Sequence, residues 1–318
     1  MQIAFAGSIA YDYLMTFPGV FTDHILPDRL DTLSLSFLVD DMTRQRGGIA
    51  PNIAYNHALL GGRATIVGAA GRDFDEYRAA LESNGVDTSG VKVFDDVFTA
   101  SFFATTDQNN SQIASFYPGA MARAAACRIA DLDFVPDLVV ISPDDPDAMR
   151  AHVRECKQSH IPYFYDPSQQ IVRLNLDDLR EGIGGAKYLI VNEYEFSLIE
   201  DKLGMTAEQI TGQGTVLGVT KGASGSEIHV DGAVYEVAAF PPVEVKDPTG
   251  TGDAYRGGFL RGVASGWPWP VAGMLGALSA TYCLEQVGTQ NHKYSRAEYV
   301  ARFRQHFDDG GVLDALLE

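Results

Sequence analysis

A glycine-rich segment in the last quarter of the chain holds the residues best suited to chemistry. Residues 247–259 read Asp-Pro-Thr-Gly-Thr-Gly-Asp-Ala-Tyr-Arg-Gly-Gly-Phe. Pro248 ends a preceding element, Gly250 and Gly252 allow a tight loop, and the apolar residues that follow predict a helix over 253–265. The free amides and the positive dipole end of a helix N-terminus favour negative charge. The segment therefore predicts an anion site, either for a bound phosphate or for charge that develops during a reaction.

Asp253 lies inside this predicted anion site. The field of the helix should keep its carboxylate ionised, so that it could accept a proton from a substrate hydroxyl. The amides of Gly250, Thr251 and Gly252 would hold the phosphoryl group being transferred. A helix cap is the alternative role for Asp253, with glycines that only turn the chain. The residues alone leave both roles open.

The composition favours a soluble enzyme over a protein that binds nucleic acids or membranes. The 318 residues carry 24 basic and 42 acidic side chains, a net charge of −18, and such a field repels nucleic acids and anionic membranes. Cys127, Cys156 and Cys283 are widely spaced and odd in number, which predicts reduced core thiols in a cytoplasmic protein. The apolar start, Met1 to Gly7, has no basic region and indicates a buried strand instead of a targeting signal.

Short apolar runs alternate with amphipathic stretches, as in parallel strands joined by crossover helices. This pattern predicts one doubly wound α/β domain over residues 1–318. The expected strands are Ile3–Ala6, Ala64–Gly68, Leu138–Ser142, Tyr163–Asp166, Tyr188–Val191 and Val216–Thr220. The expected helices cover 50–60, 73–84, 145–159, 194–203, 253–265, 271–285 and 296–307.

Two regions break this alternation and predict a small β-lid. Leu33–Val39 nearly alternates apolar with polar side chains, and Ala100–Thr105 with Gln112–Tyr117 is typical of a hairpin. We expect the lid to use residues from about 11 to 46 and from 98 to 118.

Polar residues that follow the expected strands should meet at one edge of the sheet, where open α/β sheets bind ligands. Gly47, Gly48 and Asn52 open the first expected helix, and Asp12 follows the first strand. Adjacent glycines allow a ligand to approach closely, and Asp12 with Asn52 supplies the donors and acceptors that a vicinal diol needs. A hinge at the two glycines and a turn at Asp12 are the alternative.

A second group of polar residues could hold a nucleotide. Asn192–Glu195 reads Asn-Glu-Tyr-Glu after one expected strand, and Thr220–Gly225 reads Thr-Lys-Gly-Ala-Ser-Gly after the next. By themselves, Glu195 also fits an exposed helix acid, and Gly222 and Gly225 fit a hairpin turn. The chain lacks a Gly-x-x-x-x-Gly-Lys-Ser/Thr loop and a Gly-x-Gly-x-x-Gly turn after a strand, which disfavours Walker-type NTPases and dinucleotide dehydrogenases. The sequence does not show which basic residue contacts the phosphates; the candidates are Arg173, Lys221 and Arg256.

Two of these motifs resemble the signatures of the ribokinase-like (PfkB) family of sugar and nucleoside kinases. They are Asp-Pro-Thr-Gly-x-Gly-Asp-Ala with a Gly-Gly-Phe helix at 247–259, and Gly-Gly-x-x-x-Asn-x-Ala at 47–54. In that family the last Asp is the catalytic base, the glycine loop is the anion hole, and the Gly-Gly and Asn hold the sugar. The resemblance implies a ribokinase-like, mostly parallel sheet flanked by helices, with a β-lid, and a kinase activity.

Within the family, almost the whole chain is similar to bacterial adenosine kinases. The similarity is carried by Gly7–Gly19, Leu33–Asp41, Gln112–Met121, Asp166–Gln170 and Gly288–Gln290. It implies ribose contacts from Ser8, Asp12, Ser36, Gly47, Gly48 and Asn52, and a purine held between Phe102 and Phe116, with Gln169 and Gln170 near the base. An aromatic pair suits base stacking, although two apolar positions of lid strands are the alternative for these residues.

The resemblance also implies ATP and Mg²⁺ as cofactors. The nucleotide would contact Thr220, Gly222 and Gly225, while Asn192 and Glu195 would order the metal through water. K⁺ stimulation through Asp247 and Thr249, and a homodimer formed by lid strands, are implied too. We therefore expect transfer of the γ-phosphoryl group of ATP to the ribose 5′-hydroxyl of adenosine, giving AMP and ADP. The alternatives are a ribokinase- or fructokinase-like sugar kinase, a broad-specificity nucleoside kinase, and a silent ligand-binding protein.

Overall fold

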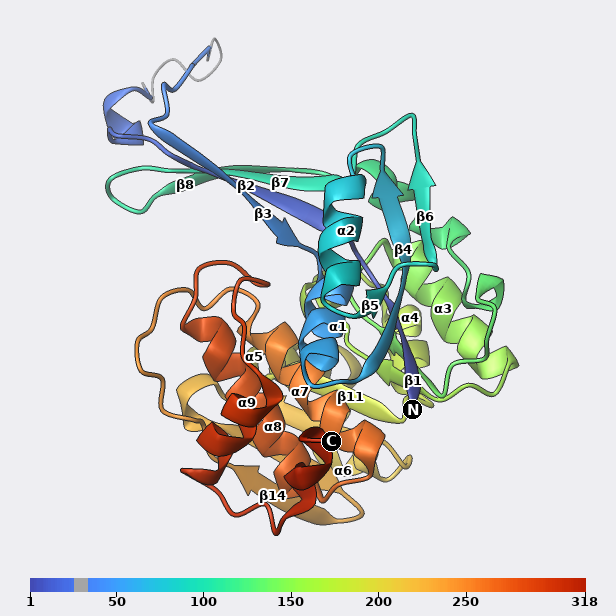
Figure 1. The fold of residues 1–318 in the computed structure, drawn as a ribbon. Coiled ribbons are helices and arrows are strands. Elements are labelled where there is room, and N and C mark those ends of the chain that lie inside the picture. The colour runs from blue at the N-terminus through green and yellow to red at the C-terminus, as the bar shows by residue number, and fades with distance from the viewer. Residues whose placement is uncertain (26–33) are drawn as a thin grey trace.

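The computed structural model describes residues 1–25 and 34–318 (Figure 1). Its strands are β1 (Gln2–Ala6), β2 (Ala10–Thr16), β3 (Asp41–Gly47), β4 (Arg63–Gly71), β5 (Val86–Asp87), β6 (Val91–Phe94), β7 (Ala100–Thr106), β8 (Gln112–Tyr117), β9 (Leu138–Ile141), β10 (Tyr163–Tyr165), β11 (Tyr188–Asn192), β12 (Val216–Thr220), β13 (Ser226–Val230) and β14 (Ala233–Val237). Its α-helices are α1 (Ile49–Leu59), α2 (Asp75–Ser83), α3 (Pro146–Gln158), α4 (Leu176–Ile183), α5 (Glu193–Leu203), α6 (Ala207–Thr211), α7 (Thr251–Ser265), α8 (Trp269–Leu284) and α9 (Arg296–Arg304).

The larger of two sheets has ten strands and is parallel through its centre. The strand order is β14-β13-β12-β11-β10-β9-β1-β4-β5, with β6 paired to β4. Every pair from β12 to β5 is parallel, whereas β13 and β14 add an antiparallel edge. Parallel strands need crossover connections, and the intervening helices supply them on both faces. The expected doubly wound, mostly parallel α/β fold is confirmed.

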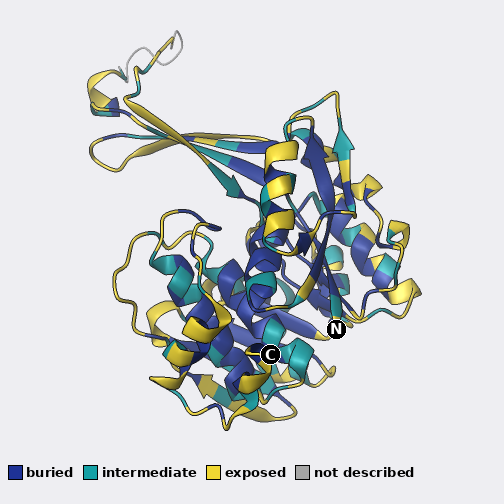
Figure 2. Cartoon of the chain, in the orientation of Figure 1, coloured by how far each residue is buried: buried dark blue, intermediate teal, exposed yellow. Residues whose placement is uncertain are grey.

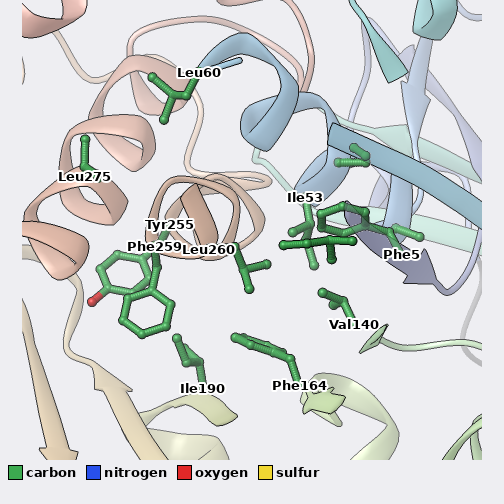
Figure 3. Close-up of a cluster of buried hydrophobic side chains, with 14 of the residues drawn as sticks. Phe5, Ile53, Leu60, Val140, Phe164, Ile190, Tyr255, Phe259, Leu260 and Leu275 are labelled. Atoms are coloured by element: carbon green, nitrogen blue, oxygen red, sulfur yellow. The ribbon is translucent and has the colours of Figure 1, made fainter. Parts of the chain in front are cut away.

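Alternate residues of the central strands face opposite helix layers. On one face Phe5, Val140 and Phe164 share a core cluster with residues of α1, α7 and α8, among them Ile53 and Phe259 (Figure 3). On the other face the intervening strand residues pack with α3, α4, α5 and α6. Figure 2 shows the resulting buried band through the sheet, with exposure on the outer sides of the helices. Burial on both faces explains why these strands are continuous apolar runs in the sequence.

The smaller sheet, which we call the lid sheet, has the strand order β3-β2-β7-β8 and projects away from the body of the molecule (Figure 1). Strands β2 and β7 pair in parallel, with Asp12 opposite Phe102, and β7 pairs antiparallel with β8, with Phe102 opposite Phe116. These three side chains therefore form one row across one face of the lid sheet. That this sheet opens and closes as a lid is still a prediction.

The expected elements of the central sheet are confirmed in existence and order, and the lid hairpin is confirmed as β7 and β8. The lid strand expected at Leu33–Val39 is wrong: residues 34–39 form no strand or helix, and Leu33 lies outside the described residues. The strand is β3, which pairs only with β2 at the sheet edge and is mostly exposed. An edge strand exposed on both faces has no apolar alternation to reveal it. Also missed were α4, α6 and the strands β2, β5, β6, β13 and β14.

Helix α8 is a core helix, as its apolar sequence predicts. It packs along α7 so closely that a Cβ on Gly276 would lie 2.8 Å from the carbonyl oxygen of Tyr255. Likewise, a Cβ on Gly258 of α7 would lie 2.4 Å from the carbonyl oxygen of Leu275. The described residues include no helix that is both long and apolar enough to span a membrane. Backbone contact between α7 and α8 thus fixes where the first turn of α7 sits at the sheet edge.

Replacing Gly258 by Ala should test this contact. Gly→Ala inside a helix ordinarily stabilises by up to about 1 kcal/mol, but here the methyl group meets a fixed carbonyl oxygen. We expect a loss of roughly 1–3 kcal/mol in the free energy of unfolding, as for other overpacked cores, measured by urea denaturation. Glu200→Ala, on the exposed side of α5, is the control and should change stability by about 0.5 kcal/mol at most. A Gly258→Ala protein as stable as the wild type would contradict close α7–α8 packing.

Candidate active site

The glycine loop before α7 has the geometry expected of an anion site. Gly250 is the N-cap of α7 in the left-handed conformation, with φ of 78°. A Cβ at this position would also lie 2.6 Å from the methyl carbon of Thr289, so both the backbone and the close packing require glycine. Thr251, Gly252 and Asp253 form the first turn, whose amides have no acceptor within the helix. The amide of Thr251 makes only a long bond of 3.3 Å within the loop.

Asp253 is 7% exposed, and its Oδ2 accepts a hydrogen bond of 2.9 Å from Nδ2 of Asn52. Burial raises the pKa of Asp253 to about 7, although the charge of Arg256 and the bond from Asn52 favour the ionised form. Burial therefore works against the ionised form expected from the sequence, and ionisation of this carboxylate at neutral pH stays a prediction. Among the described residues no backbone amide donates to it, so Asp253 does not cap the helix. A carboxyl with a pKa near neutral pH is well suited to accept a proton.

Asp253 lines a cavity of about 500 Å³, which we call the first cavity. The first cavity gathers most of the residues expected to bind substrate: Ser8, Asp12, Gly48, Asn52, Phe102, Phe116, Gln169 and Gln170, together with Thr249 and Gly250. The sequence predicts no role for five other lining residues, Ala10, Ile49, Met121, Pro143 and Thr289. Ala10, Met121 and Thr289 lie in segments that carry the resemblance to adenosine kinases, whereas Ile49 and Pro143 look like ordinary core or loop residues. Residues that lie far apart in the chain thus face one space.

Gly47 and Gly48 allow this wall to form. Gly48 is the N-cap of α1 with φ of 92°, and a Cβ there would lie 2.4 Å from the carbonyl oxygen of Ser8. Gly47 does not line the first cavity, but a Cβ on it would lie 2.7 Å from Oδ2 of Asp12. Burial raises the pKa of Asp12 to about 6. The two glycines therefore make room for the end of β1 and for the carboxylate of Asp12.

Gln169, Gln170 and Ser36, which were expected to contact the substrate, differ in burial and in their position relative to the first cavity. Gln170 is buried, and its Nε2 donates 2.8 Å to the carbonyl oxygen of Asp144, which fixes its amide, whereas Gln169 is exposed at the cavity. Ser36 is exposed and is not among the described residues that line the first cavity. The resemblance to adenosine kinases implied this contact, and the described part of that segment, residues 34–39, forms no strand.

A second cavity, of about 620 Å³, gathers three of the residues expected to bind the nucleotide, Thr220, Gly222 and Gly225, together with Thr251 and Gly252 of the expected anion hole. Its other walls are largely apolar and were missed, since Ala239, Phe240, Val245, Ala277, Ala280 and Leu284 look like core residues in the sequence. The glycine loop separates the two cavities, because Gly250 lines the first while Thr251 and Gly252 line the second. A group could pass from one cavity to the other over the first turn of α7.

Asn192 and Glu195 are not among the described residues lining either cavity. They form a capping box at the start of α5: Asn192 Oδ1 accepts from the amide of Glu195 at 2.8 Å, and Glu195 Oε2 accepts from the amide of Asn192 at 2.9 Å. This arrangement supports a structural role for the pair. Glu195 Oε2 also lies 3.9 Å from Nη2 of Arg256, which connects this helix to the glycine loop.

The three candidate cations occupy different environments. Lys221 pairs with Glu227, and Arg173 is exposed at the first cavity. Arg256 is 6% exposed, and its Nη2 donates 2.8 Å to Asp166 Oδ1. A Cβ on Gly252 would lie 2.9 Å from its Nη1, so the guanidinium lies directly beneath the glycine loop.

The loop around Asp247 could hold a cation only with other ligands. Asp247 Oδ1 accepts from the amide of Thr249 at 2.9 Å, and Oδ2 accepts from the amide of Gly288 at 3.0 Å. Partial burial works against ionisation, but these amides hold the pKa of Asp247 below its ordinary value. Within residues 1–25 and 34–318 no cluster of three or more His, Cys, Asp or Glu side chains could bind a metal. A metal at this site would therefore depend on ligands from a bound molecule, from water or from backbone carbonyls.

Comparison with known proteins agrees with this geometry. The family model for pfkB carbohydrate kinases matches residues 11–295. A nucleoside kinase of Methanothermobacter thermautotrophicus is 30% identical over 303 residues, which are 93% of this chain and 94% of that protein. The ligand-free structure of Burkholderia thailandensis nucleoside kinase is 37% identical, with a TM-score of 0.87 over 95% of this chain and 100% of that one.

The same Burkholderia enzyme has also been solved in complex with ADP-inosine, and that structure gives a TM-score of 0.83 at 37% identity over 96% of both chains. Structures of ribokinases, such as that of Thermotoga maritima at 20% identity and a TM-score of 0.77 over 96% of this chain and 99% of that one, share the fold. The family match covers both glycine motifs and every strand of the larger sheet except β1. The chain therefore belongs to the pfkB family of carbohydrate kinases, and it is a phosphotransferase with an alcohol group as acceptor.

Proposed function

We propose that the protein is a nucleoside kinase that transfers the γ-phosphoryl group of ATP to the ribose 5′-hydroxyl of adenosine or a related nucleoside. One observation carries the proposal: Asp253 and the glycine loop lie between a polar and aromatic cavity on one side and an apolar cavity on the other. The first would hold the acceptor and the second the base of ATP. Relatives named as nucleoside kinases support the choice of acceptor.

The walls of the first cavity favour a nucleoside over a bare sugar. Asp12, Asn52 and Ser8 offer polar atoms for a ribose diol, whereas Phe102, Phe116 and the apolar neighbours offer a surface for a flat base. A volume of about 500 Å³ lies within the range of sites that enclose a drug-sized ligand. A pentose alone would leave the aromatic side chains without a partner.

In the proposed reaction Asp253 acts as the general base. Its carboxylate takes the proton of the 5′-hydroxyl while the oxygen forms a bond to the γ-phosphorus and the bond to the β,γ-bridging oxygen breaks, which leaves ADP, the phosphorylated nucleoside and a protonated Asp253. The amides of the N-cap Gly250 and of Thr251 and Gly252 in the first turn stabilise the charge on the transferred group. Arg256 adds a fixed positive charge beneath them.

Mg²⁺ would arrive with the phosphates of ATP and neutralise part of their charge. Glu195 would act on the metal only through water. Its Oε2 accepts a hydrogen bond from the amide of Asn192, so Oε1 is the oxygen left to hold a water molecule. K⁺ would be held by Asp247, which stays ionised, and by backbone oxygens near Thr249.

We also propose that the chain works as one domain over residues 1–318, that the lid sheet closes over the acceptor, and that lid strands of two copies form a homodimer.

A panel of acceptors tests the proposal. Release of ADP from ATP would be followed with adenosine, inosine, guanosine, cytidine, ribose and fructose, and we expect turnover with at least one nucleoside and little with either sugar. Turnover with several nucleosides would favour the broad-specificity alternative, for which the inosine complexes of the Burkholderia relative are the motivating observation. Turnover with sugars alone would overturn the nucleoside assignment.

Asp253→Asn should lower kcat about 10²- to 10⁴-fold, the usual contribution of general-base catalysis, with the nucleoside Kd from calorimetry nearly unchanged. Asn keeps the shape and can still accept from Asn52, but it cannot take a proton.

In the wild type, kcat/KM should fall as the pH drops below about 7, because burial raises the pKa of Asp253 to about 7 and only the ionised form is a base. The variant should lack this acidic limb. Near-native turnover in the variant would contradict the assignment.

Phe116→Ala should weaken nucleoside binding by about 1–3 kcal/mol, the usual value of base–aromatic stacking. Tyr117→Ala is the matched control, since Tyr117 is the next residue of β8 and strand alternation points it to the other face. Both affinities would be measured by calorimetry. Equal losses in the two variants would mean that the lid was damaged as a whole and that Phe116 makes no specific contact with the base.

A further inference from the structure

The orientation of Asn52 is fixed by two residues from a distant turn. Its Oδ1 accepts 2.8 Å from Oγ1 of Thr289 and 2.8 Å from Nε2 of Gln290. With two donors on the oxygen, the amide nitrogen must face the other way, where it donates 2.9 Å to Oδ2 of Asp253. Without these donors the carboxamide could turn over and present its oxygen to the carboxylate.

Other buried polar groups support the same assignment. Asn56 Nδ2 donates 3.0 Å to the carbonyl oxygen of Asn52, and the ring nitrogen Nε2 of His292 lies 2.8 Å from Asn56 Oδ1. Burial lowers the pKa of His292 to about 4, so the ring is neutral and donates to Asn56. Each side chain around Asn52 therefore has one consistent choice of donor and acceptor.

The same turn also contacts the end of lid strand β3. Oγ1 of Thr289 lies 2.9 Å from the carbonyl oxygen of Arg46, as well as 2.8 Å from Oδ1 of Asn52. A hydroxyl carries a single proton, so Thr289 serves one of these two acceptors fully at a time. How strongly it holds Asn52 thus depends on where the carbonyl of Arg46 lies.

A second connection runs through Gln290. Its Nε2 donates to both Asn52 Oδ1, at 2.8 Å, and Tyr77 Oη, at 2.5 Å. The hydroxyl of Tyr77 donates 2.8 Å to the carbonyl oxygen of Gly47, the last residue of β3. Burial raises the pKa of Tyr77 far above its ordinary value, which keeps it a donor. Two hydrogen-bonded paths therefore join the end of β3 to the carboxylate of Asp253.

We propose that Thr289 and Gln290 are positioning residues that orient Asn52 and, through it, Asp253, and that they couple this orientation to the position of lid strand β3. They act on the carboxylate and do not contribute the main affinity for substrate. The inference rests on the proposed role of Asp253 as the general base. This coupling would align the base when the lid sheet, of which β3 is the edge strand, closes over the first cavity.

The experiment compares Thr289→Val with Thr289→Ser in the full-length protein, with ATP and the best nucleoside acceptor. Val keeps the methyl group that packs on Gly250 but has no hydroxyl, and Ser keeps the hydroxyl. We expect Thr289→Val to lower kcat about 10- to 100-fold, the cost of small misplacement at a reacting centre, with an unchanged nucleoside Kd by calorimetry. Thr289→Ser should retain most of kcat, and Gln290→Glu, which replaces a donor by an acceptor, should behave like Thr289→Val.

The pH profile supplies a readout that mere loss of stability would not give. Weakening the bond from Asn52 should move the acidic limb of kcat/KM upward by about 0.5 to 1 pH unit, the equivalent of one hydrogen bond. The groups that face Asp253 are Arg256 on its own helix, Asn52 of α1, Asp166 after β10, Glu195 of α5 and Cys283 of α8, and none is changed by the substitutions. Asn291→Ala is the control: it removes bonds to Gln45 of β3 and to the carbonyl oxygen of Val287 but none to Asn52, and it should leave kcat and the limb unchanged.

The outcomes separate the two proposals. If the wild type phosphorylates no nucleoside, the proposed function fails. If Asp253→Asn is fully active, the assignment of Asp253 as the base fails, and the positioning role that rests on it fails too. If the wild type is active and Asp253→Asn is not, but Thr289→Val and Gln290→Glu retain wild-type kcat and pH profile, the positioning role alone is overturned. A raised nucleoside Kd with unchanged kcat in Thr289→Val would also overturn it, because Thr289 would then be a substrate contact.

Discussion

The free-energy cost of ionising a carboxyl group in a nearly dry position governs the design of this site. Shielding from water raises the pKa of Asp253 to about 7, which makes its carboxylate a stronger base but leaves less of it ionised at neutral pH. Two contacts offset part of that cost, the charge of Arg256 and the hydrogen bond from Asn52. The negative charges of Asp166 and Glu195 act against them. The balance leaves a carboxyl that changes protonation state near neutral pH, which suits a group that must take up and release a proton in each cycle.

Arg256 explains why a glycine occupies position 252. The guanidinium lies under the loop, and a side chain on Gly252 would meet its Nη1 at 2.9 Å. Away from the loop, Nη2 of Arg256 donates hydrogen bonds to Asp166 Oδ1, Ser168 Oγ and the carbonyl oxygen of Ile190. In a chain with a net charge of −18, phosphates would otherwise meet an unfavourable field. The guanidinium of Arg256 and the amides of the first turn place positive charge beside the two cavities, and Asp166 and Glu195 offset part of the charge of Arg256.

Features encoded by neighbouring residues could be predicted, and features that depend on distant contacts could not. The glycine loop, the helix after it and the apolar strands could be recognised in the sequence, because each is marked by neighbouring residues: glycines in the loop, and the spacing of apolar residues in the helix and strands. The role of Arg256 was not, since nothing near it in the sequence shows that Asp166 and the glycine loop enclose it. The walls of the second cavity, such as Phe240 and Leu284, look like core residues until the fold leaves a space beside them. Strand β3 carries charged residues at an exposed edge, so it lacked the apolar alternation by which strands are recognised.

The lid sheet and the helices of the body both line the first cavity, so a movement of the lid sheet would act on the chemistry that we propose for Asp253. Asp12, Phe102 and Phe116 form a row across the lid sheet and would move together, because neighbouring strands hold them in register. Asn52 and Asp253 belong to helices of the body, which close backbone contacts hold in place. A substrate that touches both groups would draw the lid sheet toward the body, and the end of β3 would move with it. Since Arg46 and Gly47 at that end are hydrogen-bonded to Thr289 and Tyr77, closing the cavity and aligning the base would be parts of one movement.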